Sequence, residues 1–340
     1  MKLITFTVPC YNSEDYMCRC IDSLLKAGDE AEIIIVNDGS TDRTGEIANQ
    51  YQDLYPEIVS VVHKQNGGHG SGVNAGLERA SGLYFKVVDS DDWLDENALF
   101  HVMNKLKGWE MIQSPVDMVV CNYVYDHLFE GTTKRMGYEN VFRENRRTDW
   151  KSIGRFRPSQ YLIMHALIFR TAVLKKSKVK LPEHTFYVDN IFANKPLSYV
   201  QSMVYLNEDL YHYFLGREDQ SVNEQVLMKR IDQQILVTKL LVTGFDMEGI
   251  RKSNPKLERY LIRNISIMMS ISCIHLMLIG DEEAMEKRRV LWEFVKQTDK
   301  HIYRHLRFRS VSGATYLPGK IGDKLTMCGY GIAKRTYQFN

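Results

Sequence analysis

Two patterns of hydrophobic and polar positions divide the chain. In the first 125 residues, short runs rich in β-branched residues alternate with stretches of helical spacing, which is typical of parallel βαβ units. The runs are almost continuously apolar, as expected for strands that are covered on both faces of a sheet. They predict strands at residues 4–8, 32–37, 59–63, 84–88 and 118–125.

The alternation is lost in a polar stretch at residues 131–157, which predicts a loop or a mobile excursion. Mixed elements follow, with a helix expected from Thr171 onward. They predict a mixed α/β domain that is complete near residue 222. The strand-like runs of this part are residues 165–170, 201–206 and 210–214.

A helical module is predicted after residue 222, because apolar residues recur there with helical spacing at 224–243, 255–279 and 282–298. Its most apolar stretch, residues 265–279, contains polar residues and is shorter than the roughly 18 residues that span a membrane. We interpret this stretch as a buried helix. A membrane-contacting helix and an interface helix of a homo-oligomer are the alternatives.

Polar or glycine-rich segments follow the first four predicted strands, at residues 9–13, 37–42, 64–70 and 89–92. In an open parallel sheet the carboxyl ends of the strands lie along one edge, and ligands of such folds bind in the crevice outside them. The four segments therefore predict a ligand site at that edge.

Composition excludes several classes of protein. The 340 residues are 44% hydrophobic and 25% charged, as in ordinary globular proteins, and a net charge of +2 does not indicate a nucleic-acid binder. Six scattered cysteines without a C-x-x-C pair argue against a disulfide framework or a structural zinc site, and they favour a reducing cytoplasm. The N-terminal segment lacks the features of a signal peptide and is interpreted as a first strand.

One local segment is strongly basic. Residues 300–309 contain Lys300, Arg304, Arg307 and Arg309 together with aromatic side chains. This basic tail could rest on an anionic membrane surface or be an ordinary solvated face.

The acidic cluster Asp89, Asp91 and Asp92 follows a hydrophobic strand. Three carboxylates so close together are costly unless a cation or several donors neutralise them. Mg²⁺ and Mn²⁺ prefer such oxygen ligands together with substrate phosphates. The alternative is a helix N-terminus, where acidic residues interact favourably with the helix dipole.

Residues 70–75 match G-x-G-x-x-A after a strand, which is a weak signal for a nicotinamide dinucleotide site. The glycines follow the third strand rather than the first, and the acidic position that follows is a triple cluster. A dehydrogenase is therefore disfavoured.

Four motifs together resemble the GT-A-fold glycosyltransferases of family 2, of the bacterial type that makes cell-surface polysaccharides. They are V-P-C-Y-N at residues 8–12, V-N-D-G-S-T-D at 36–42, N-G-G at 66–68 with N-A-G at 74–76, and D-S-D-D at 89–92. The resemblance extends from residue 3 to about residue 221. It implies a GT-A catalytic domain at 1–221, with a nucleotide-binding half at 1–125 and an acceptor half at 126–221, followed by the helical module at 222–340 with the basic tail.

By this resemblance the protein is an inverting glycosyltransferase that moves a sugar from a UDP-sugar to a hydroxyl of a glycan, lipid-linked or protein-linked acceptor. It would work in the cytoplasm or peripherally at the inner face of the cell membrane. Asp38 would accept from the uracil N3–H, a contact that cytosine cannot supply, although turn chemistry also explains Asp38. Asp91 and Asp92 would hold Mn²⁺ or Mg²⁺.

The resemblance implies a larger nucleotide-sugar site. Arg217 and Ser221 would face the diphosphate, and His165 would lie near the sugar or the acceptor. An ordinary surface ion pair with Glu218 or Asp219 is the alternative for Arg217, and a structural histidine is the alternative for His165. The implied nucleotide-sugar-binding residues are Pro9, Tyr11, Glu14, Asp38, Asn66, Gly67, Gly70, Asp89, Asp91, His165, Arg217 and Ser221.

Residues 186–192, F-Y-V-D-N-I-F, resemble the family segment that carries the catalytic base. Val188 stands where that segment usually has Glu, and the next residue, Asp189, is the implied base. A general base contributes roughly 10² to 10⁴ in rate. Capping of the following helix is the alternative for Asp189.

Two other functions stay open. A sugar nucleotidyltransferase shares a nucleotide-binding sheet and a metal, but its glycine-rich N-terminal phosphate loop is missing from this sequence. A catalytically weak nucleotide-sugar-binding or scaffold subunit of a glycan assembly complex is suggested by Val188. The presence of Asp89, Asp91 and Asp92 together with Asp189 and Arg217 argues against such a scaffold subunit.

Overall fold

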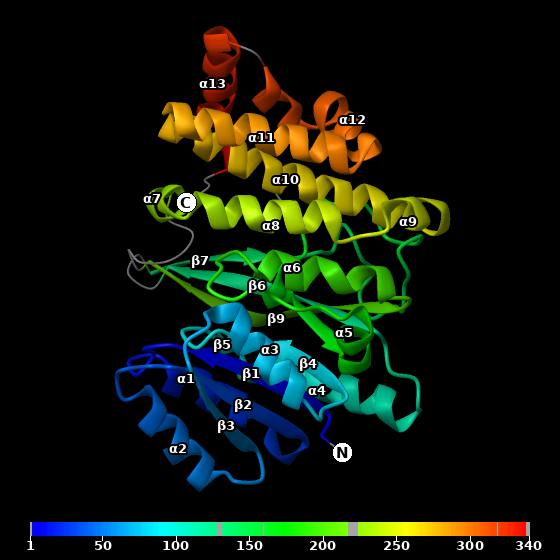
Figure 1. The fold of residues 1–340 in the computed structure, drawn as a ribbon. Coiled ribbons are helices and arrows are strands. Elements are labelled where there is room, and N and C mark those ends of the chain that lie inside the picture. Colours follow the sequence, from blue (N-terminus) through cyan, green and yellow to red (C-terminus); the bar gives the residue numbers. More distant parts are fainter. Residues whose placement is uncertain (1, 128–130, 159, 217–223, 318, 338–340) are drawn as a thin grey trace. The chain divides into compact units, whose positions relative to one another are not determined.

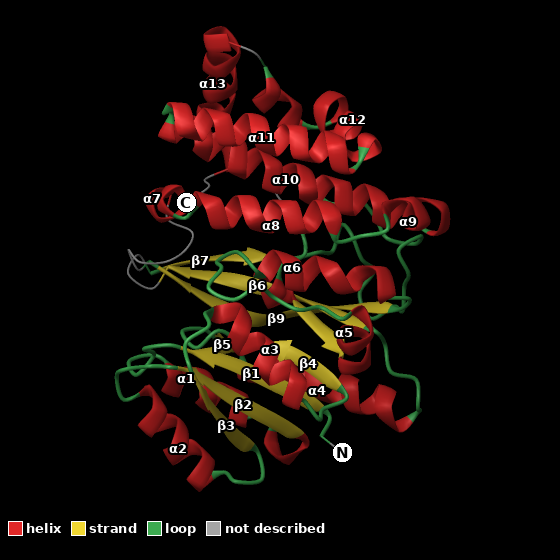
Figure 2. Cartoon of the chain, in the orientation of Figure 1, coloured by secondary structure: helices red, strands yellow, loops and turns green. Residues whose placement is uncertain are grey.

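The computed structural model describes residues 2–127, 131–158, 160–216, 224–317 and 319–337 (Figure 1). The chain forms two compact units, Met1–Gly216 and Arg217–Asn340. Strands and helices alternate in the first unit, and the described part of the second unit consists of helices (Figure 2).

A nine-stranded mixed sheet is the centre of the first unit. Its strands are β1 (Ile4–Cys10), β2 (Ala31–Asp38), β3 (Val59–Lys64), β4 (Tyr84–Val87), β5 (Trp93–Leu94), β6 (Met118–His127), β7 (Thr132–Met136), β8 (Leu167–Arg170) and β9 (Met203–Leu215). The order along the sheet is β3-β2-β1-β4-β8-β6-β9-β5, and β7 pairs with β6. The pairs among β3, β2, β1 and β4 are parallel, as is β6 with β9, whereas β8 is antiparallel to β4 and β6.

Hydrophobic burial explains the parallel half. The four β-branched residues at 33–36 of β2 are at most 1% exposed, because helices cover both faces of the sheet. The predicted strands at 4–8, 32–37, 59–63, 84–88 and 118–125 are confirmed, most of them one to three residues longer than the hydrophobic runs. The predicted mixed, mainly parallel sheet is confirmed as well.

Helices fill the connections of this unit. They are α1 (Met17–Leu25), η1 (Gly28–Glu30), α2 (Thr44–Leu54), α3 (His69–Arg79), α4 (Glu96–Met111), η2 (Met164–Ala166), α5 (Thr171–Ser177), α6 (Asp189–Asn194) and η3 (Lys195–Tyr199). Helix α3 lies very close to β1. A Cβ atom added at Gly76 would be 2.3 Å from the Thr7 side chain, and one added at Gly72 would be 2.9 Å from Pro9.

The prediction of a loop at residues 131–157 was wrong in part. The stretch contains β7, whose residues are nearly all exposed and therefore give no hydrophobic signal in the sequence. It also contains Trp150 and Tyr138, which are 0% and 1% exposed. The stretch is therefore anchored in the core.

Two further predictions were wrong in detail. Strands at 201–206 and 210–214 are one strand, β9, because Asn122 of β6 and Arg135 of β7 supply hydrogen bonds to Asp209 in the polar middle of the strand. The helix expected at 224–243 is interrupted at Arg230, whose backbone leaves the helical region.

The second unit is built around one central helix. Its helices are α7 (Glu224–Lys229), α8 (Ile231–Thr243), α9 (Met247–Ser253), α10 (Pro255–Ile279), α11 (Glu282–Thr298), α12 (Lys300–Arg309), η4 (Val311–Tyr316) and α13 (Gly319–Tyr337). Helix α10 begins at Pro255 after the N-cap Asn254 and ends before Gly280, which has φ 74°. Within the described residues, α10 contacts every other helix of this unit.

By length and composition, α10 is also the one helix in the described part of the chain that could cross a membrane. Its most apolar window has a mean hydropathy of 1.6, and 56% of that window is buried within the structure. The prediction of a buried helix is consistent with this central position.

We expect Gly76→Ala to lower the free energy of unfolding by about 1–3 kcal/mol, because the new methyl group would overlap the Thr7 side chain and push α3 away from β1. Gly108→Ala is the matched control. Gly108 lies in α4 with nothing within 4 Å of an added Cβ, and alanine should stabilise the helix by up to about 1 kcal/mol. Urea unfolding of both variants measures the difference, and equal effects of the two substitutions would contradict the close approach.

Candidate active site

The loops that follow β1 and β2 are joined to the acidic loop at the carboxyl edge of the sheet. The Asn12 side chain accepts from the Thr41 backbone N–H at 2.9 Å, and the Ser40 hydroxyl accepts from the Asn12 N–H at 3.1 Å. The Ser13 hydroxyl lies 2.8 Å from the Ser90 hydroxyl. The predicted convergence of polar loops on one edge is therefore observed for these three, and the fourth segment, 64–70, joins them through hydrogen bonds to Asp38 and Asp89.

Asp38, at the end of β2, is only 2% exposed. Its carboxylate accepts from the Lys64 ammonium at 2.6 Å and from the backbone N–H groups of Gly67 and Gly68 at 2.7 to 3.1 Å. The Asn66 side chain donates to the Asp38 backbone carbonyl at 2.9 Å. In this arrangement Asp38 holds the N-G-G loop in place, and its predicted contact with uracil stays a prediction.

The other residues predicted near the nucleotide lie along the same edge. Pro9 is buried beneath Gly72 of α3, whereas Tyr11 is 54% exposed. Glu14 is half-buried and accepts from the Arg43 backbone N–H at 3.0 Å. These residues form a surface at the ends of β1 and β2, and Tyr11 is its most exposed side chain.

Asp92 is the buried anchor of the acidic loop, with an exposure of 0%. One carboxylate oxygen accepts from the Tyr211 hydroxyl, and the other accepts from the Phe214 N–H at 2.8 Å. The same Tyr211 hydroxyl accepts from the Asp89 N–H at 3.1 Å. Burial, followed by the charges of Asp91 and Asp89, raises the pKa of Asp92 well above its ordinary value.

His69, the first residue of α3, pairs with Asp89 across a distance of 2.7 Å between Nε2 and Oδ1. Burial alone would lower the pKa of His69, but Asp89, and then Asp189 and Asp91, raise it above its ordinary value. The pKa of Asp89 moves downward, because the opposing charge of His69 outweighs its burial. The pair is thus favoured in its charged form.

His165 lies on η2 with its ring stacked on Tyr211, 4.6 Å between centroids and 8° between planes. Burial lowers the pKa of His165 to about 4, so its ring is neutral near pH 7. Beneath it, the fully buried Lys86 ammonium donates to the His165 carbonyl at 2.6 Å. Burial lowers the pKa of Lys86 to about 8.

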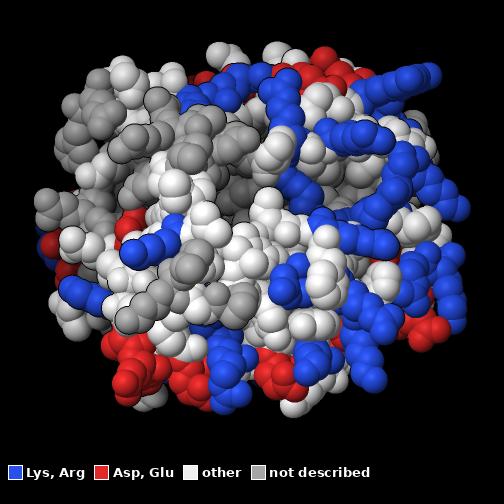
Figure 3. Space-filling view, turned by 90° about the horizontal axis from the view of Figure 1, so that it is seen from above, with Lys and Arg blue, Asp and Glu red and all other residues white. Residues whose placement is uncertain are grey.

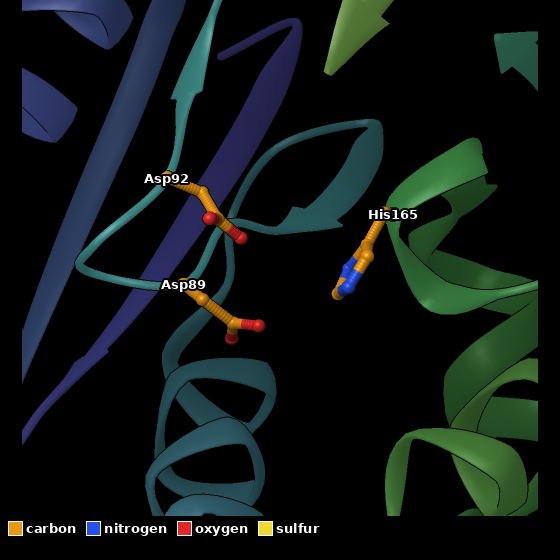
Figure 4. Close-up of side chains that lie close together, drawn as sticks. All are labelled: Asp89, Asp92 and His165. Carbon is orange, nitrogen blue, oxygen red and sulfur yellow. The ribbon is translucent and has the colours of Figure 1, made fainter. Parts of the chain in front are cut away.

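The acidic loop and His165 together fit a divalent cation. The ligand atoms of Asp89, Asp92 and His165 lie within 4.8 Å of one another, and Figure 4 shows the three side chains directed toward a shared space. Within the described residues, the buried Nδ1 atom of His165 has no hydrogen-bond partner. Asp91 lies outside this geometric group, although it is half-buried on the same loop.

Asp189 is the first residue of α6 and is half-buried. The N-cap position of that helix is Val188, and Asp189 is the acidic residue of its first turn, where its carboxylate interacts with backbone N–H groups of the helix N-terminus. Burial, and then the charge of Asp89, raises the pKa of Asp189, while His69 opposes this shift in part. His69 is therefore electrostatically coupled to both Asp89 and Asp189.

The segment before Asp189 is fastened to α3. Asn74 exchanges two hydrogen bonds with the Leu181 backbone, at 2.8 and 2.9 Å, and the Gly67 carbonyl accepts from the His184 N–H at 2.6 Å. A Cβ added at Gly70 would be 2.8 Å from the Pro182 carbonyl oxygen and 3.3 Å from the Val188 side chain. Gly70, predicted to bind the nucleotide sugar, is placed here as a packing residue, and Val188 is buried at 1% exposure.

The structure brings Asp89, Asp91, Asp92, His165 and Asp189 to one region, with His69 between the acidic loop and Asp189. Arg217 and Ser221 lie outside the described residues. Sequence reasoning missed His69, although it lies within the quoted glycine-rich motif, and it also missed Lys86 and Tyr211. An ionisable residue inside a hydrophobic strand, as Lys86 is, was an available signal.

Comparison with known proteins places this site in a family. A family model described as "Glycosyl transferase family 2" matches residues 5–176, half of the chain. The uncharacterized glycosyltransferase EpsJ of Bacillus subtilis is 40% identical over 124 residues, which cover 36% of this chain and 34% of EpsJ. The poly(ribitol-phosphate) beta-glucosyltransferase of Bacillus spizizenii is 25% identical over 332 residues, which cover 90% of this chain and 47% of that protein. The matched segments thus cover less than half the length of each of these two relatives.

Solved structures give the same fold. TarS from S. aureus, residues 1–349 in complex with UDP-GlcNAc, superposes with a TM-score of 0.67 and 20% sequence identity. The superposition covers 93% of this chain and 88% of that chain. At this identity the likeness establishes the fold.

We expect the pKa of His69 in metal-free protein to lie above 6.5 and to fall in Asp89→Asn, because the carboxylate that favours the imidazolium is lost. Since the folded-state pKa exceeds the unfolded one, the pair stabilises most below pH 6.5 and loses this contribution as pH rises through the folded pKa. NMR titration of the histidine ring protons measures both values. His305, whose pKa burial lowers, is the internal control and should not respond. An unchanged His69 pKa in Asp89→Asn would contradict the pairing.

Proposed function

Because the chain belongs to glycosyl transferase family 2 and is a glycosyltransferase with a GT-A fold, we propose that it transfers a sugar from a UDP-sugar with inversion at the anomeric carbon. The observation that carries the proposal is the coupling of the acidic loop, through His69, to the half-buried Asp189. A carboxylate base opposite a cation-binding loop is what a one-step displacement of a diphosphate needs.

UDP is the proposed nucleotide. Its support is the V-N-D-G-S-T-D motif at residues 36–42 and the fold shared with TarS, which was crystallised with UDP-GlcNAc. Tyr11 is the exposed ring at the end of β1 and is positioned to cover a planar base. For the Asp38 carboxylate to reach the base, the Lys64 ammonium must move aside, because Lys64 and two backbone N–H groups occupy it in this structure.

Asp91 and Asp92 are the proposed protein ligands of Mn²⁺ or Mg²⁺, with Asp89 and His165 beside them. Each Asp92 oxygen accepts one hydrogen bond and keeps a second lone pair. A cation there would lower the cost of burying three carboxylates. When bound, it would neutralise the charge that develops on the departing diphosphate.

Asp189 is the proposed general base. Its raised pKa brings it closer to neutral pH and makes the carboxylate a stronger proton acceptor than an exposed aspartate. The proton moves from the attacking acceptor hydroxyl to the Asp189 carboxylate as that oxygen bonds to the anomeric carbon. Val188 and Gly70 fix the backbone at this point, so Asp189 does not depend on a neighbouring Glu for its position.

The proposed acceptor is a hydroxyl of a glycan or of a lipid-linked or protein-linked saccharide, at the cytoplasmic side of a membrane. A catalytically weak nucleotide-sugar-binding or scaffold subunit is the second candidate, and Val188 is the observation that suggests it. The transferase and the scaffold subunit differ in turnover, because a scaffold would bind the UDP-sugar without releasing UDP from it.

UDP release from a panel of UDP-sugars with Mn²⁺ or Mg²⁺ tests the proposal. One UDP-sugar should yield UDP, EDTA should abolish the release, and Asp189→Asn should lower the rate by about 10²- to 10⁴-fold, because the base is lost while binding remains. Asp53→Asn, an exposed aspartate of α2, is the matched control and should leave the rate unchanged. A rise in melting temperature with UDP should persist in Asp189→Asn.

The outcomes separate the candidates. UDP that stabilises the protein without any release from the panel would favour the scaffold subunit. If no UDP-sugar of the panel yields UDP and UDP does not stabilise the protein, the UDP-sugar proposal is ruled out.

Peripheral membrane contact is proposed for the second unit. Helix α12 carries Lys300 and Arg304 on one stripe with Phe308, which is 70% exposed, and Val311 follows at 76% exposure. The sequence contains no acidic residue from 300 to 317. Figure 3 shows Lys and Arg side chains gathered mainly over the right-hand part of one face, with acidic ones mainly along its upper and lower edges. Cations beside exposed apolar side chains suit an anionic lipid surface.

We expect the protein to sediment with vesicles that contain phosphatidylglycerol and not with vesicles of phosphatidylcholine alone. Binding should weaken at high salt, and Arg304→Glu should reduce it on the order of tenfold, because each basic residue near such a surface contributes about 1 kcal/mol. Lys252→Glu, at an exposed position of α9, is the control. Equal binding to both vesicle types would contradict the electrostatic contact.

A further inference from the structure

Two paired strands of the first unit carry the same Tyr-x-Tyr pattern. Tyr123 and Tyr125 lie in β6, and Tyr211 and Tyr213 lie opposite them in β9. The register pairs Tyr123 with Tyr211 and Tyr125 with Tyr213. Because side chains alternate along a strand, all four rings project from one face of the sheet.

That face is the one that carries His165. The His165 ring is 4.6 Å from the rings of both Tyr211 and Tyr213, and 6.5 Å from that of Tyr123. His212, between the two tyrosines of β9, bonds to Asp126 instead, as alternation requires for the opposite face. Helix α6, which begins at Asp189, packs against η2, which carries His165.

The inner and outer tyrosines differ in burial. Tyr123 and Tyr211 are 3% and 0% exposed, and the Tyr211 hydroxyl is committed to Asp92. Tyr125 and Tyr213 are half-buried, and their ring centroids are 5.7 Å apart with a tilt of 39°. The outer pair therefore forms a partly open aromatic surface on a rigid, buried base.

One end of this surface is fixed to the acidic loop, because Tyr211, the neighbour of Tyr213 on the same face of β9, donates to Asp92. The His165 segment η2, whose ring lies on these tyrosines, contacts the helix that begins at Asp189. Burial raises the pKa of Tyr213, and Asp92 and Asp89 raise it further. Burial likewise raises the pKa of Tyr125, where the nearby carboxylate is Asp189. The charges that act on Tyr213 thus come from the acidic loop, and the charge that acts on Tyr125 comes from Asp189.

We propose that Tyr125 and Tyr213 form the acceptor subsite and that they stack against the apolar face of a pyranose ring, one hydroxyl of which faces Asp189. The inference rests on the proposed function. The C–H groups on one face of a pyranose are apolar and weakly positive, which matches the negative face of a tyrosine ring. An open-chain polyol, a serine or threonine side chain, or a lipid phosphate offers no such face. The acceptor is therefore a sugar ring, at the end of a glycan or a glycolipid.

The test uses the full chain, the UDP-sugar selected by the release assay, and methyl pyranosides of several hexoses and N-acetylhexosamines as acceptors. Ribitol and a serine-containing peptide are the comparison acceptors. Tyr125→Leu and Tyr213→Leu remove the aromatic face and keep apolar volume, whereas the Tyr→Phe variants keep the ring. Tyr55→Ala, at an exposed tyrosine that follows α2, is the control and should behave as wild type.

We expect transfer to at least one pyranoside. Each Leu variant should raise the KM for that acceptor on the order of tenfold, while the KM for the UDP-sugar changes by less than about threefold and the Phe variants stay within about threefold of wild type. A change in the KM for the acceptor without a change in the KM for the UDP-sugar is not expected from damage to packing, because damaged packing would change both KM values.

Several outcomes would overturn the inference. Transfer to ribitol or the peptide but to no pyranoside would do so, as would Leu and Phe variants that behave alike. A raised KM for the UDP-sugar with an unchanged acceptor KM would assign the tyrosines to the donor sugar instead. Failure of wild type to release UDP from any UDP-sugar would reject the proposed function and this subsite with it, whereas failure of the subsite alone leaves UDP release intact.

Discussion

The buried carboxylate of Asp92 is the constraint on which the site depends. Its two oxygens take hydrogen bonds from the Tyr211 hydroxyl and the Phe214 N–H, and this ties the loop after β4 to β9, far away in sequence. A buried carboxyl group with unsatisfied oxygens is costly, so the two donors and the loop specify each other's positions. Asp89 and Asp91, on the same turn, are then carried to the carboxyl edge of the sheet without contributing to the core themselves.

Helix α3 gives the second half of the site its position. Its N-terminal His69 bonds to Asp89, and Asn74, one and a half turns later, holds the Leu181 backbone. Small residues on the same helix allow close contact with β1 on one side and with the segment before Asp189 on the other. One helix thus relates the acidic loop to Asp189, and the distance between them is fixed by the packing of backbone on backbone. Contacts between closely packed backbone segments allow less movement than contacts between long side chains.

The sequence alone predicted the features that depend on local signals. Strands of the parallel half were evident from continuous apolar runs, and the loops that carry Asp38 and Asp89 were evident because they follow those runs. Features that depend on which segments pair in space were not predicted from the sequence. Exposed β7 has no hydrophobic signal, and the polar middle of β9 is a strand only because Asn122 and Arg135 supply partners. The bond between His69 and Asp89 joins residues twenty positions apart and requires knowledge of where α3 begins.

The buried ammonium group of Lys86 affects the electrostatics of the acidic loop. A cation in the middle of β4, with carbonyl oxygens as its hydrogen-bond acceptors in the described residues, lies close enough to Asp89 and Asp92 for their charges to favour its protonated form. With a pKa of about 8 it is mostly charged at neutral pH. The chain therefore has an internal counter-ion beneath its acidic loop. Such a counter-ion lowers the electrostatic cost of holding three carboxylates on one turn, independently of any ligand bound at the surface.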